Sequence, residues 1–323
     1  MKIQINSLLQ YRSYAILILG LMFGNFINAH GTGGASKKHI VDLVETEPAG
    51  KKKKVIHILA IGNSFSADAL ETHFFGIAQA AGVRVIIGNL AAPGAPLDFH
   101  VKNFETSANP YLYTKIVLDG TKTVTRNASF GMALKDEKWD YITFQQVSHY
   151  AGKYETFGEN LPKLVNYVRD SIKYDGVKFA LHQTWAYAET SNHPGFPNYN
   201  NDQLTMYKAI VKAVNQAAKL VKIKTIIPAG TAIQNARTSV MGSDLTTDGF
   251  HLSPSTGRYI AAAVWFEKLT GQDVIGNPYS PAGIGSEELA IMQRAAHAAV
   301  KKPDTITVIQ PVSKTSKKLN IAN

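Results

Sequence analysis

The sequence predicts an α/β domain with a mainly parallel central sheet. Residues 55–61 form a continuous apolar run rich in β-branched side chains, as in a strand that is buried on both faces. Similar short runs recur along the chain, and helical stretches separate several of them, which is typical of βαβ units. The composition agrees, because a chain of 323 residues that is 45% hydrophobic and 18% charged is not disordered, collagen-like or a coiled coil.

The elements can be placed in order along the chain. A helix follows the first strand, with Ser66 as its expected N-cap and Gly82 as its stop. Further strands are expected at residues 83–87, 141–144, 177–181 and 225–227. Further helices are expected at residues 160–172, 203–221, 254–269 and 286–300; Ser253 is expected to cap the third of these and Pro254 to begin it.

Residues 1–29 have the three parts of a secretory signal peptide. Lys2 and Arg12 give a basic start, residues 15–23 form a short apolar run, and Ala29 is the small residue that a signal peptidase needs. The apolar run is shorter than the about 20 residues of a transmembrane helix, and no cysteine follows it that could carry a lipid. We expect cleavage after Ala29 and a periplasmic or secreted protein without a stable membrane anchor; the alternative is an uncleaved anchor helix.

The rest of the chain divides where its composition changes. Residues 30–54 are interpreted as a linker, because glycines lie near its start and a run of four lysines ends it. Residues 55–302 are interpreted as one α/β domain, and residues 303–323 as a C-terminal tail that can add an edge strand.

Charge and cysteine content exclude several classes of protein. The formal net charge is +10, and much of the excess lies in the linker and the tail. Such basic segments suit nucleic acid, an anionic membrane or an acidic polymer, but no nucleic-acid-binding motif accompanies them, so we expect no nucleic-acid partner. The chain has no cysteine, which excludes a disulfide framework, a thiol nucleophile and a zinc site built on thiolates.

Ser64 is a candidate nucleophile because it follows the carboxyl end of the first strand, where parallel α/β sheets bind ligands. Residues 62–66 read Gly-Asn-Ser-Phe-Ser. Gly62 permits a tight strand-to-helix turn, and backbone N–H groups at a helix start favour a developing negative charge. The alternative is an ordinary N-cap serine, since a nucleophile also needs a base.

The candidate base is His251, which follows Asp248 by three residues on the loop leading into the helix expected at 254–269. This spacing lets a carboxylate bond one imidazole nitrogen while the other faces outward, which sets the tautomer that a general base needs. A plain surface loop is the alternative. Both sets of residues are expected at one edge of the sheet, and this favours catalysis.

Residues 62–66 and 248–251 together resemble the SGNH (GDSL-like) hydrolase superfamily, and the resemblance extends over residues 55–270. It implies a flavodoxin-like three-layer sandwich and an esterase or lipase with a Ser–His–Asp triad and an oxyanion hole. In that pattern Ser64 is the nucleophile, His251 the base and Asp248 the acid that orients it. Asn63 stands where the family has an aspartate of structural importance.

The resemblance also implies donors for the oxyanion. Gly94, in the loop after the second strand, matches the glycine of the family's second block, although a simple turn glycine explains it equally well. The third block departs from the family's Gly-x-Asn-Asp: residues 144–148 read Phe-Gln-Gln-Val-Ser, which looks like an uncharacterised branch found in Bacteroidetes. A glutamine amide can donate the same hydrogen bond. Because successive strand residues face opposite sides, one of Gln145 and Gln146 is expected to serve, with Gln145 favoured.

Two residues after another expected strand are candidates for substrate contact. Trp185 is interpreted either as a sugar-stacking wall or as a core residue, and His182 as part of the pocket. The loop at 190–202 is interpreted as a lid or as a plain surface loop. We expect no metal and no cofactor; the histidines without metal-ligand spacing are His57, His73, His100, His149 and His297.

These features lead us to expect an exported serine esterase whose partner is an acylated carbohydrate. The favoured reaction is removal of O-acetyl groups from a polysaccharide or oligosaccharide. Two alternatives stay open: a non-catalytic glycan-binding protein on a decayed hydrolase fold, and a lipid-ester hydrolase with an apolar acyl groove. Nothing in the sequence sets the oligomeric state.

Overall fold

Five parallel strands form the centre of the sheet. They are β1 (Val55–Gly62), β2 (Arg84–Ala91), β5 (Tyr141–Phe144), β6 (Lys178–His182) and β7 (Thr225–Ile227). In the computed structural model, which describes residues 54–311, they lie in the order β2-β1-β5-β6-β7, and each neighbouring pair is parallel. This is the strand order of flavodoxin-like folds, and the carboxyl ends of β1, β5 and β6 therefore lie side by side.

An antiparallel hairpin extends the sheet beyond β2. β3 (Tyr111–Ile116) pairs with β2, and β4 (Lys122–Ala128) forms the edge. Neither strand was predicted from the sequence. Every residue of β4 except Ala128 is exposed, so no apolar alternation marks that strand. The Asp-Gly turn between the strands was the available signal: Gly120 has a φ of +85°, and the Asp119 carboxylate accepts a hydrogen bond from the Thr121 N–H.

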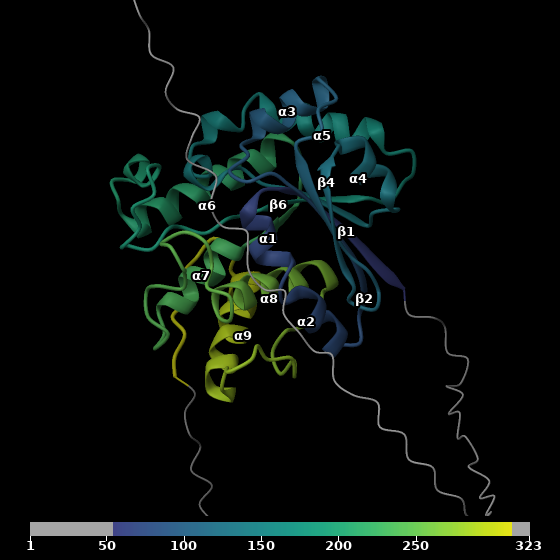
Figure 1. Ribbon diagram of the computed structural model, residues 1–323. Helices are drawn as coiled ribbons and strands as arrows, with labels where there is room; N and C mark the ends of the chain where they lie inside the picture. The colour runs from purple at the N-terminus through teal and green to yellow at the C-terminus, as the bar shows by residue number, and fades with distance from the viewer. Residues whose placement is uncertain (1–53, 312–323) are drawn as a thin grey trace, which may run out of the picture. The chain divides into compact units, whose positions relative to one another are not determined.

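Helices cover both faces of the sheet and make a three-layer α/β sandwich, which confirms the predicted fold class (Figure 1). α3 (Leu97–Glu105), α4 (Phe130–Asp136) and α5 (Asn160–Ser171) pack together on one face. On the other face, α1 (Ser64–Leu70) and α2 (Phe74–Ala80) pack on α8 (Gly257–Thr270), and α7 (Ala229–Arg237) and α9 (Ser286–Lys301) pack on α8 as well. α6 (Gln203–Leu220) links β6 to β7, and three short 3₁₀ turns lie at residues 148–150, 154–156 and 196–199.

The single helix expected after β1 is in fact two helices, and its N-cap is Asn63 rather than Ser66. The Asn63 side chain accepts the Phe65 N–H and caps α1. The chain breaks at residues 71–73, where the His73 ring nitrogens lie 2.9 Å from the Tyr279 hydroxyl and 2.7 Å from the Pro254 carbonyl. These partners are far away in the sequence, so local periodicity could not reveal the break.

α8 begins three residues later than expected, with Thr256 as its N-cap. Residues 254–256 form a turn, and Ser253 still accepts the Gly257 N–H at its hydroxyl. A β-carbon at Gly257 would lie 2.4 Å from the Leu245 carbonyl oxygen, so this position requires glycine. The start of α8 is thus set by close packing against the loop that carries His251.

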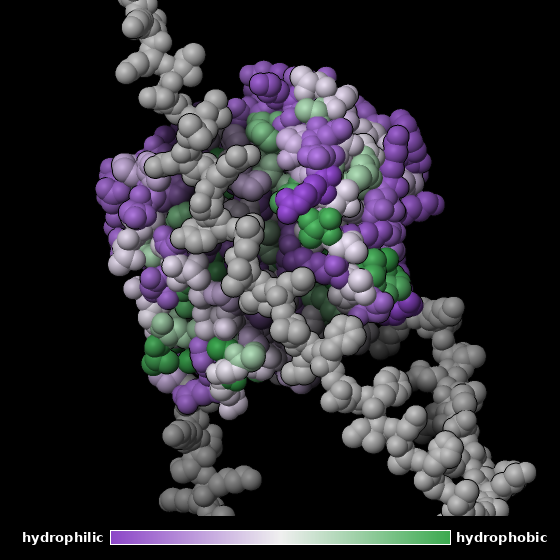
Figure 2. All heavy atoms as spheres, in the orientation of Figure 1, coloured by the Kyte–Doolittle hydropathy of each residue, from purple (hydrophilic) through white to green (hydrophobic). Residues whose placement is uncertain are grey.

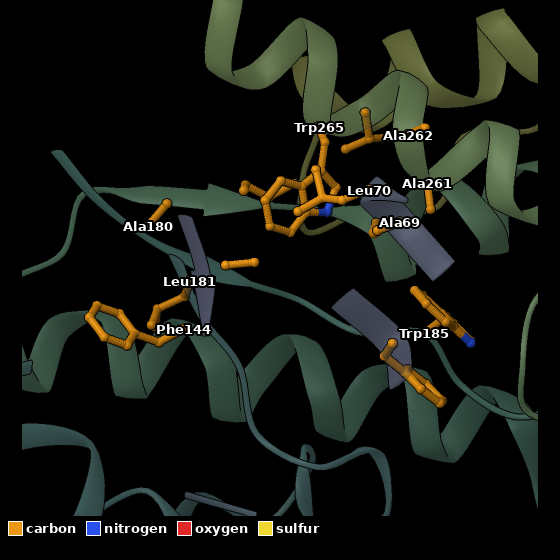
Figure 3. Close-up of a cluster of buried hydrophobic side chains, with 14 of the residues drawn as sticks. Ala69, Leu70, Phe144, Ala180, Leu181, Trp185, Ala261, Ala262 and Trp265 are labelled. Carbon is orange, nitrogen blue, oxygen red and sulfur yellow. The ribbon is translucent and has the colours of Figure 1, made fainter. Parts of the chain in front are cut away.

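The core lies on both faces of the sheet, against α3, α4 and α5 on one side and against α8, which is buried on nearly all sides, on the other. Figure 3 shows Trp265 of α8 on one side of the sheet, and the side chains of Phe144 of β5 and Leu181 of β6 on the other side; all three are essentially inaccessible to solvent. This packing holds the ends of β5 and β6 firmly, and the site described below is built on them.

Several expectations concern the ends of the chain. The predicted signal peptide and all but the last residue of the predicted linker lie outside the described residues. In the described part of the tail, residues 303–311 add no strand; the N–H groups of Thr307 and Ile309 bond instead to Asn235 and Thr238 at the end of α7. The expected edge strand is therefore not formed there. No helix within residues 54–311 has the length and apolar character needed to cross a bilayer.

Candidate active site

Ser64 is the first residue of α1, directly after the β1 strand and its Asn63 cap. The turn is tight enough that a β-carbon on Gly62 would lie 2.8 Å from both the Ser66 hydroxyl and the Gln145 side chain. Glycine is therefore required for the close approach of β5 to this turn. The Ser64 N–H is one of the first helical amides, which no carbonyl of the helix satisfies.

Ser64, His251 and Asp248 form a continuous hydrogen-bonded chain. The Ser64 Oγ lies 2.9 Å from His251 Nε2, and His251 Nδ1 lies 2.7 Å from Asp248 Oδ2. Asp248 uses its other oxygen to accept the backbone N–H groups of Phe250 and His251. Burial opposes ionisation of Asp248, but the hydrogen bonds from His251 and the backbone outweigh it and lower the pKa of the carboxyl group. The structure thus brings Ser64 together with the Asp248–His251 pair, although Ser64 and His251 are 187 positions apart in the sequence.

A compact turn holds Asp248 and His251 at this spacing. Thr246 and Leu252 form an isolated antiparallel bridge, and the Thr247 N–H donates to the His251 carbonyl. Gly249 has a φ of +88°, and a β-carbon there would lie 2.7 Å from the Ser191 backbone. A side chain at this position would be strained and would also collide with the neighbouring loop.

Asp68, which was not predicted from the sequence, ties this turn to the nucleophile helix. One carboxylate oxygen accepts the Leu252 N–H at 2.8 Å, and the other lies 2.8 Å from an Arg258 guanidinium nitrogen. Burial raises the pKa of Asp68, against the opposing effects of these two partners. The available signal was its position four residues after Ser64, on the same face of a helix.

A cleft of about 380 Å³ opens beside Ser64 and His251. Its charged groups are paired: Lys122 Nζ lies 2.8 Å from Glu71, and Arg258 lies 2.8 Å from Asp68. Lys122 comes from the β3–β4 hairpin, which the sequence pattern did not predict. The complete lining is Ser64, Ala67, Asp68, Glu71, Thr72, Lys122, Thr247, His251 and Arg258.

Gln145 points toward the nucleophile turn. Its Nε2 donates to the Asn63 carboxamide oxygen at 2.6 Å, and its Oε1 lies 2.8 Å from His182 Nδ1. Since Asn63 directly precedes Ser64, the Gln145 amide is held one residue away from the nucleophile. Its second Nε2 hydrogen has no acceptor among the described residues.

Gln146 faces the other way, and the structure does not support it as an oxyanion donor. Its Nε2 donates to the carbonyl and hydroxyl oxygens of Thr156, and its Oε1 accepts the N–H groups of Leu97 and Val147. Its hydrogen bonds therefore connect the segment at Leu97 with the segment at Thr156. The alternation of side chains at the strand end separates the two glutamines as expected.

Gly94 lies exposed in the loop after β2, with a φ of +66°. This loop is tied to the nucleophile turn on both sides of Gly94: the Ala92 N–H donates to the Gly62 carbonyl, and the Asn63 side-chain amide donates to the Ala95 carbonyl. The left-handed conformation alone accounts for a glycine here. Its role as an oxyanion donor stays a prediction.

Trp185 and His182 lie in the core: this agrees with the core interpretation of Trp185 rather than with a sugar-stacking wall, and it corrects the expected place of His182 in the pocket. Trp185 is fully buried; its ring stacks on Phe65 at 4.3 Å, and its Nε1 donates to the Phe250 carbonyl. His182 is 2% exposed, and burial lowers its pKa to about 3. Neither ring can reach a sugar, but both support residues next to the triad.

The loop at 190–202 packs beside the histidine turn. The ring of His193 contacts Phe250 at 4.8 Å and Tyr187 at 4.7 Å, and the Ala188 N–H donates to the Gly249 carbonyl. Burial and then the nearby His251 lower the pKa of His193. The loop therefore packs against the turn that carries His251, and none of its residues is among those that line the cleft.

One group of side chains in the described part of the chain brings possible metal ligands together. Glu267, Asp273 and His297 have ligand atoms within 4.8 Å of one another. They lie near the C-terminal end of α8, whereas His251 precedes its N-terminal end. His297 Nδ1 lies 2.9 Å from Glu267 Oε1, so these two residues contact each other directly.

Comparison with known proteins places the sequence in a family. The model of a domain of unknown function, DUF4886, matches residues 57–299. The crystal structure of a DUF4886 family protein from Bacteroides uniformis is 49% identical, with a TM-score of 0.77, and the match covers 79% of this chain and 98% of that one.

More distant matches were also found. One is a protein from Slackia heliotrinireducens assigned provisionally to the SGNH hydrolases (20% identity, TM-score 0.43, covering 67% of this chain and 100% of that one). Another is a catalytic mutant of an acetylxylan esterase from Geobacillus stearothermophilus (13% identity, TM-score 0.44, covering 66% and 93%). No curated protein matches the sequence. The match over residues 57–299 shows that the chain belongs to the DUF4886 family.

Proposed function

We propose that this protein hydrolyses carboxylic esters through an acyl-enzyme on Ser64. The observation that carries the proposal is the chain of hydrogen bonds from Ser64 through His251 to Asp248, at 2.9 and 2.7 Å. A hydroxyl is a weak nucleophile unless a base removes its proton during attack, and this arrangement supplies the base and its orienting acid.

The reaction proceeds in two halves. The Ser64 Oγ attacks the acyl carbon while His251 takes its proton, and the C–O bond to the alcohol then breaks as His251 returns that proton to the leaving oxygen. Water attacks the acyl-enzyme with the same base, and the acid is released as Ser64 is restored. Asp248 stabilises the imidazolium that forms in each half.

The oxyanion of each tetrahedral intermediate needs hydrogen-bond donors. The backbone N–H of Ser64 and the second Nε2 hydrogen of Gln145 are the donors that the geometry favours, with the N–H of Gly94 as the third. Each such donor is typically worth about 10²–10³ in rate. Gln145 thus takes the place of the asparagine in the usual third block of the SGNH pattern.

The cleft beside Ser64 supports a proposal for the substrate class. Of the residues that line it, Ala67 alone is apolar, and the others offer hydroxyl, carboxylate, amine, guanidinium or imidazole groups. On the face drawn in Figure 2, hydrophobic residues form small separate groups among hydrophilic ones. A sugar with many hydroxyls would find hydrogen-bond donors and acceptors among the polar groups of the cleft. The substrate we propose is an O-acetylated polysaccharide or oligosaccharide, met outside the cytoplasm after export by the predicted signal peptide.

Acetate release tests this proposal. The purified mature chain is incubated with a panel of acetylated polysaccharides, with Ser64→Ala as the matched variant and circular dichroism as the check on folding. We expect release from at least one glycan and a loss of several orders of magnitude in the variant. Glycan binding that is equal in both proteins, without turnover of any ester, would instead indicate a binding protein. Faster turnover of p-nitrophenyl esters longer than butyrate would indicate a lipid-ester hydrolase.

A further inference from the structure

We infer that His182 is a positioning residue for the oxyanion site, acting through Gln145 and Asn63. This inference rests on the proposed esterase function. The carboxyl ends of β6, β5 and β1 contribute one side chain each to a buried chain of hydrogen bonds. His182 Nδ1 lies 2.8 Å from Gln145 Oε1, Gln145 Nε2 lies 2.6 Å from Asn63 Oδ1, and Asn63 Nδ2 lies 3.1 Å from the Ala95 carbonyl.

Two backbone groups determine the direction of this chain at its Asn63 end. The Phe65 N–H can only donate, so it requires the Asn63 oxygen; the Ala95 carbonyl can only accept, so it requires the Asn63 nitrogen. The Asn63 amide therefore has one possible orientation. If the amide were flipped, its NH₂ group would face the Phe65 N–H, and its oxygen would face the Ala95 carbonyl oxygen.

The orientation of the Asn63 amide determines the orientation of the Gln145 amide and the tautomer of His182. Gln145 must present its NH₂ group to Asn63 Oδ1, so its oxygen faces His182. His182 must then donate from Nδ1, which leaves Nε2 without a proton. The surroundings agree: Nε2 is buried without a hydrogen-bond partner, and the ring packs edge-on against Trp265 at 5.0 Å. The buried His182 is the neutral Nδ1–H tautomer.

The function of this chain of hydrogen bonds is to keep the side-chain amide of Gln145 from flipping. If its oxygen faced the nucleophile turn, it would repel an oxyanion instead of donating to it. With the His182 N–H holding that oxygen, the second Nε2 hydrogen of Gln145 stays available for the substrate. The same chain ends on Ala95 and so also ties down the loop that carries Gly94. His182 does this without touching the substrate.

The tautomer is tested directly by two-bond ¹H–¹⁵N NMR correlation spectra of the full-length protein at pH 7. We expect the signals of His182 to show a protonated Nδ1 and an unprotonated Nε2. A proton on Nε2 would overturn the inference. This measurement does not require turnover, so failure of the hydrogen-bond chain and failure of the esterase proposal are distinguishable.

A pair of variants tests the link to catalysis. His182→Asn keeps a donor at the position of Nδ1, whereas His182→Leu removes it. For p-nitrophenyl acetate we expect the leucine variant to lose up to about 10²-fold in kcat, with KM little changed, and the asparagine variant to recover most of that loss. Affinity for methylboronic acid, whose serine adduct places an oxygen in the oxyanion site, should fall in parallel with kcat. Unchanged kcat and boronate affinity in His182→Leu, or equal losses in both variants, would overturn the inference.

Discussion

At the residue scale, the site depends on a carboxylate that is partly open to solvent. Asp248 has 42% of its side chain exposed, yet it accepts two backbone N–H groups and the His251 Nδ1–H. These bonds outweigh the effect of burial and lower the pKa of Asp248, so the group stays charged while His251 gains and loses a proton. Its exposure predicts a smaller catalytic contribution than that of a buried acid, because solvent screens its charge.

Asp248→Asn tests this contribution. The amide oxygen can keep the backbone hydrogen bonds, but its NH₂ group then faces His251 and favours the wrong tautomer. We expect kcat for p-nitrophenyl acetate to fall by more than 10-fold but by less than the about 10⁴-fold typical of a buried triad acid. The kcat of Ser64→Ala, measured alongside, should be lower still. An unchanged kcat in Asp248→Asn would remove Asp248 from the mechanism.

Local spacing decided which site residues the sequence could predict. Asp248 and His251 are three residues apart on one turn, and Ser64 follows a strand whose apolar run is unmistakable. The roles of Gln146, Trp185 and His182 depended on which side of a strand end each side chain faces. That orientation is set by partners such as Thr156 and Phe65, which no local pattern identifies.

At the scale of elements, Asp68 joins α1 to the histidine turn. Replacing it by alanine would leave the buried Leu252 N–H without an acceptor and Arg258 without its ion pair. An unsatisfied buried group of this kind typically costs about 1–3 kcal/mol. Because the turn carries His251, its displacement should also lower kcat.

Urea unfolding and esterase kinetics of Asp68→Ala check this expectation. The matched control is Asp170→Ala, an exposed residue near the end of α5, whose effect should stay within about 0.5 kcal/mol. We expect Asp68→Ala to lose both stability and kcat, with α1 intact. If its free energy of unfolding and its kcat both match those of the control, Asp68 does not connect the two elements.

Elements with strong periodicity were predicted within a few residues, whereas weakly patterned ones were missed. The bounds of β5, β7, α5 and α6 agree closely with the sequence expectations. The polar edge strand β4 was missed because almost all of its residues are exposed. The helix α7 was also missed, although its residues are buried. The hairpin matters for function, since it brings Lys122 to the cleft.

At the scale of the whole molecule, two buried histidines make stability depend on pH. Burial lowers the pKa of His100 and of His182 to about 3, from an ordinary value of 6.5. Between these values the unfolded chain binds a proton at each site that the folded chain does not bind. Stability therefore falls as the pH decreases from 6.5 to about 3, by up to about 1.4 kcal/mol per pH unit for each histidine.

His100→Phe tests this at a site remote from the triad. The phenyl ring can keep the stacking on Tyr111 but cannot titrate. Urea unfolding is measured at several pH values between 4 and 6.5. The free energy of unfolding should fall less steeply with decreasing pH in the variant than in the wild type, whatever the difference in stability between the two proteins at pH 7. Identical slopes would show that His100 is protonated in the folded protein.

The class of the fold and its layers follow from patterns that run through the whole chain. Alternating buried strands and helices predict a parallel α/β sandwich without any contact being known. The added hairpin, the break between α1 and α2, and the cleft lining depend on packing between distant segments. The class of the fold was therefore predictable from the sequence, and the shape of its site was not.

Covalent labelling with diisopropyl fluorophosphate tests the central claim most directly. The Ser64 Oγ would displace fluoride from phosphorus, with His251 taking its proton, and leave a stable adduct. We expect intact-protein mass spectrometry to show one adduct, peptide mapping to place it on Ser64, and His251→Ala to abolish it. Ester turnover by a folded protein that carries no label on Ser64 would contradict the account.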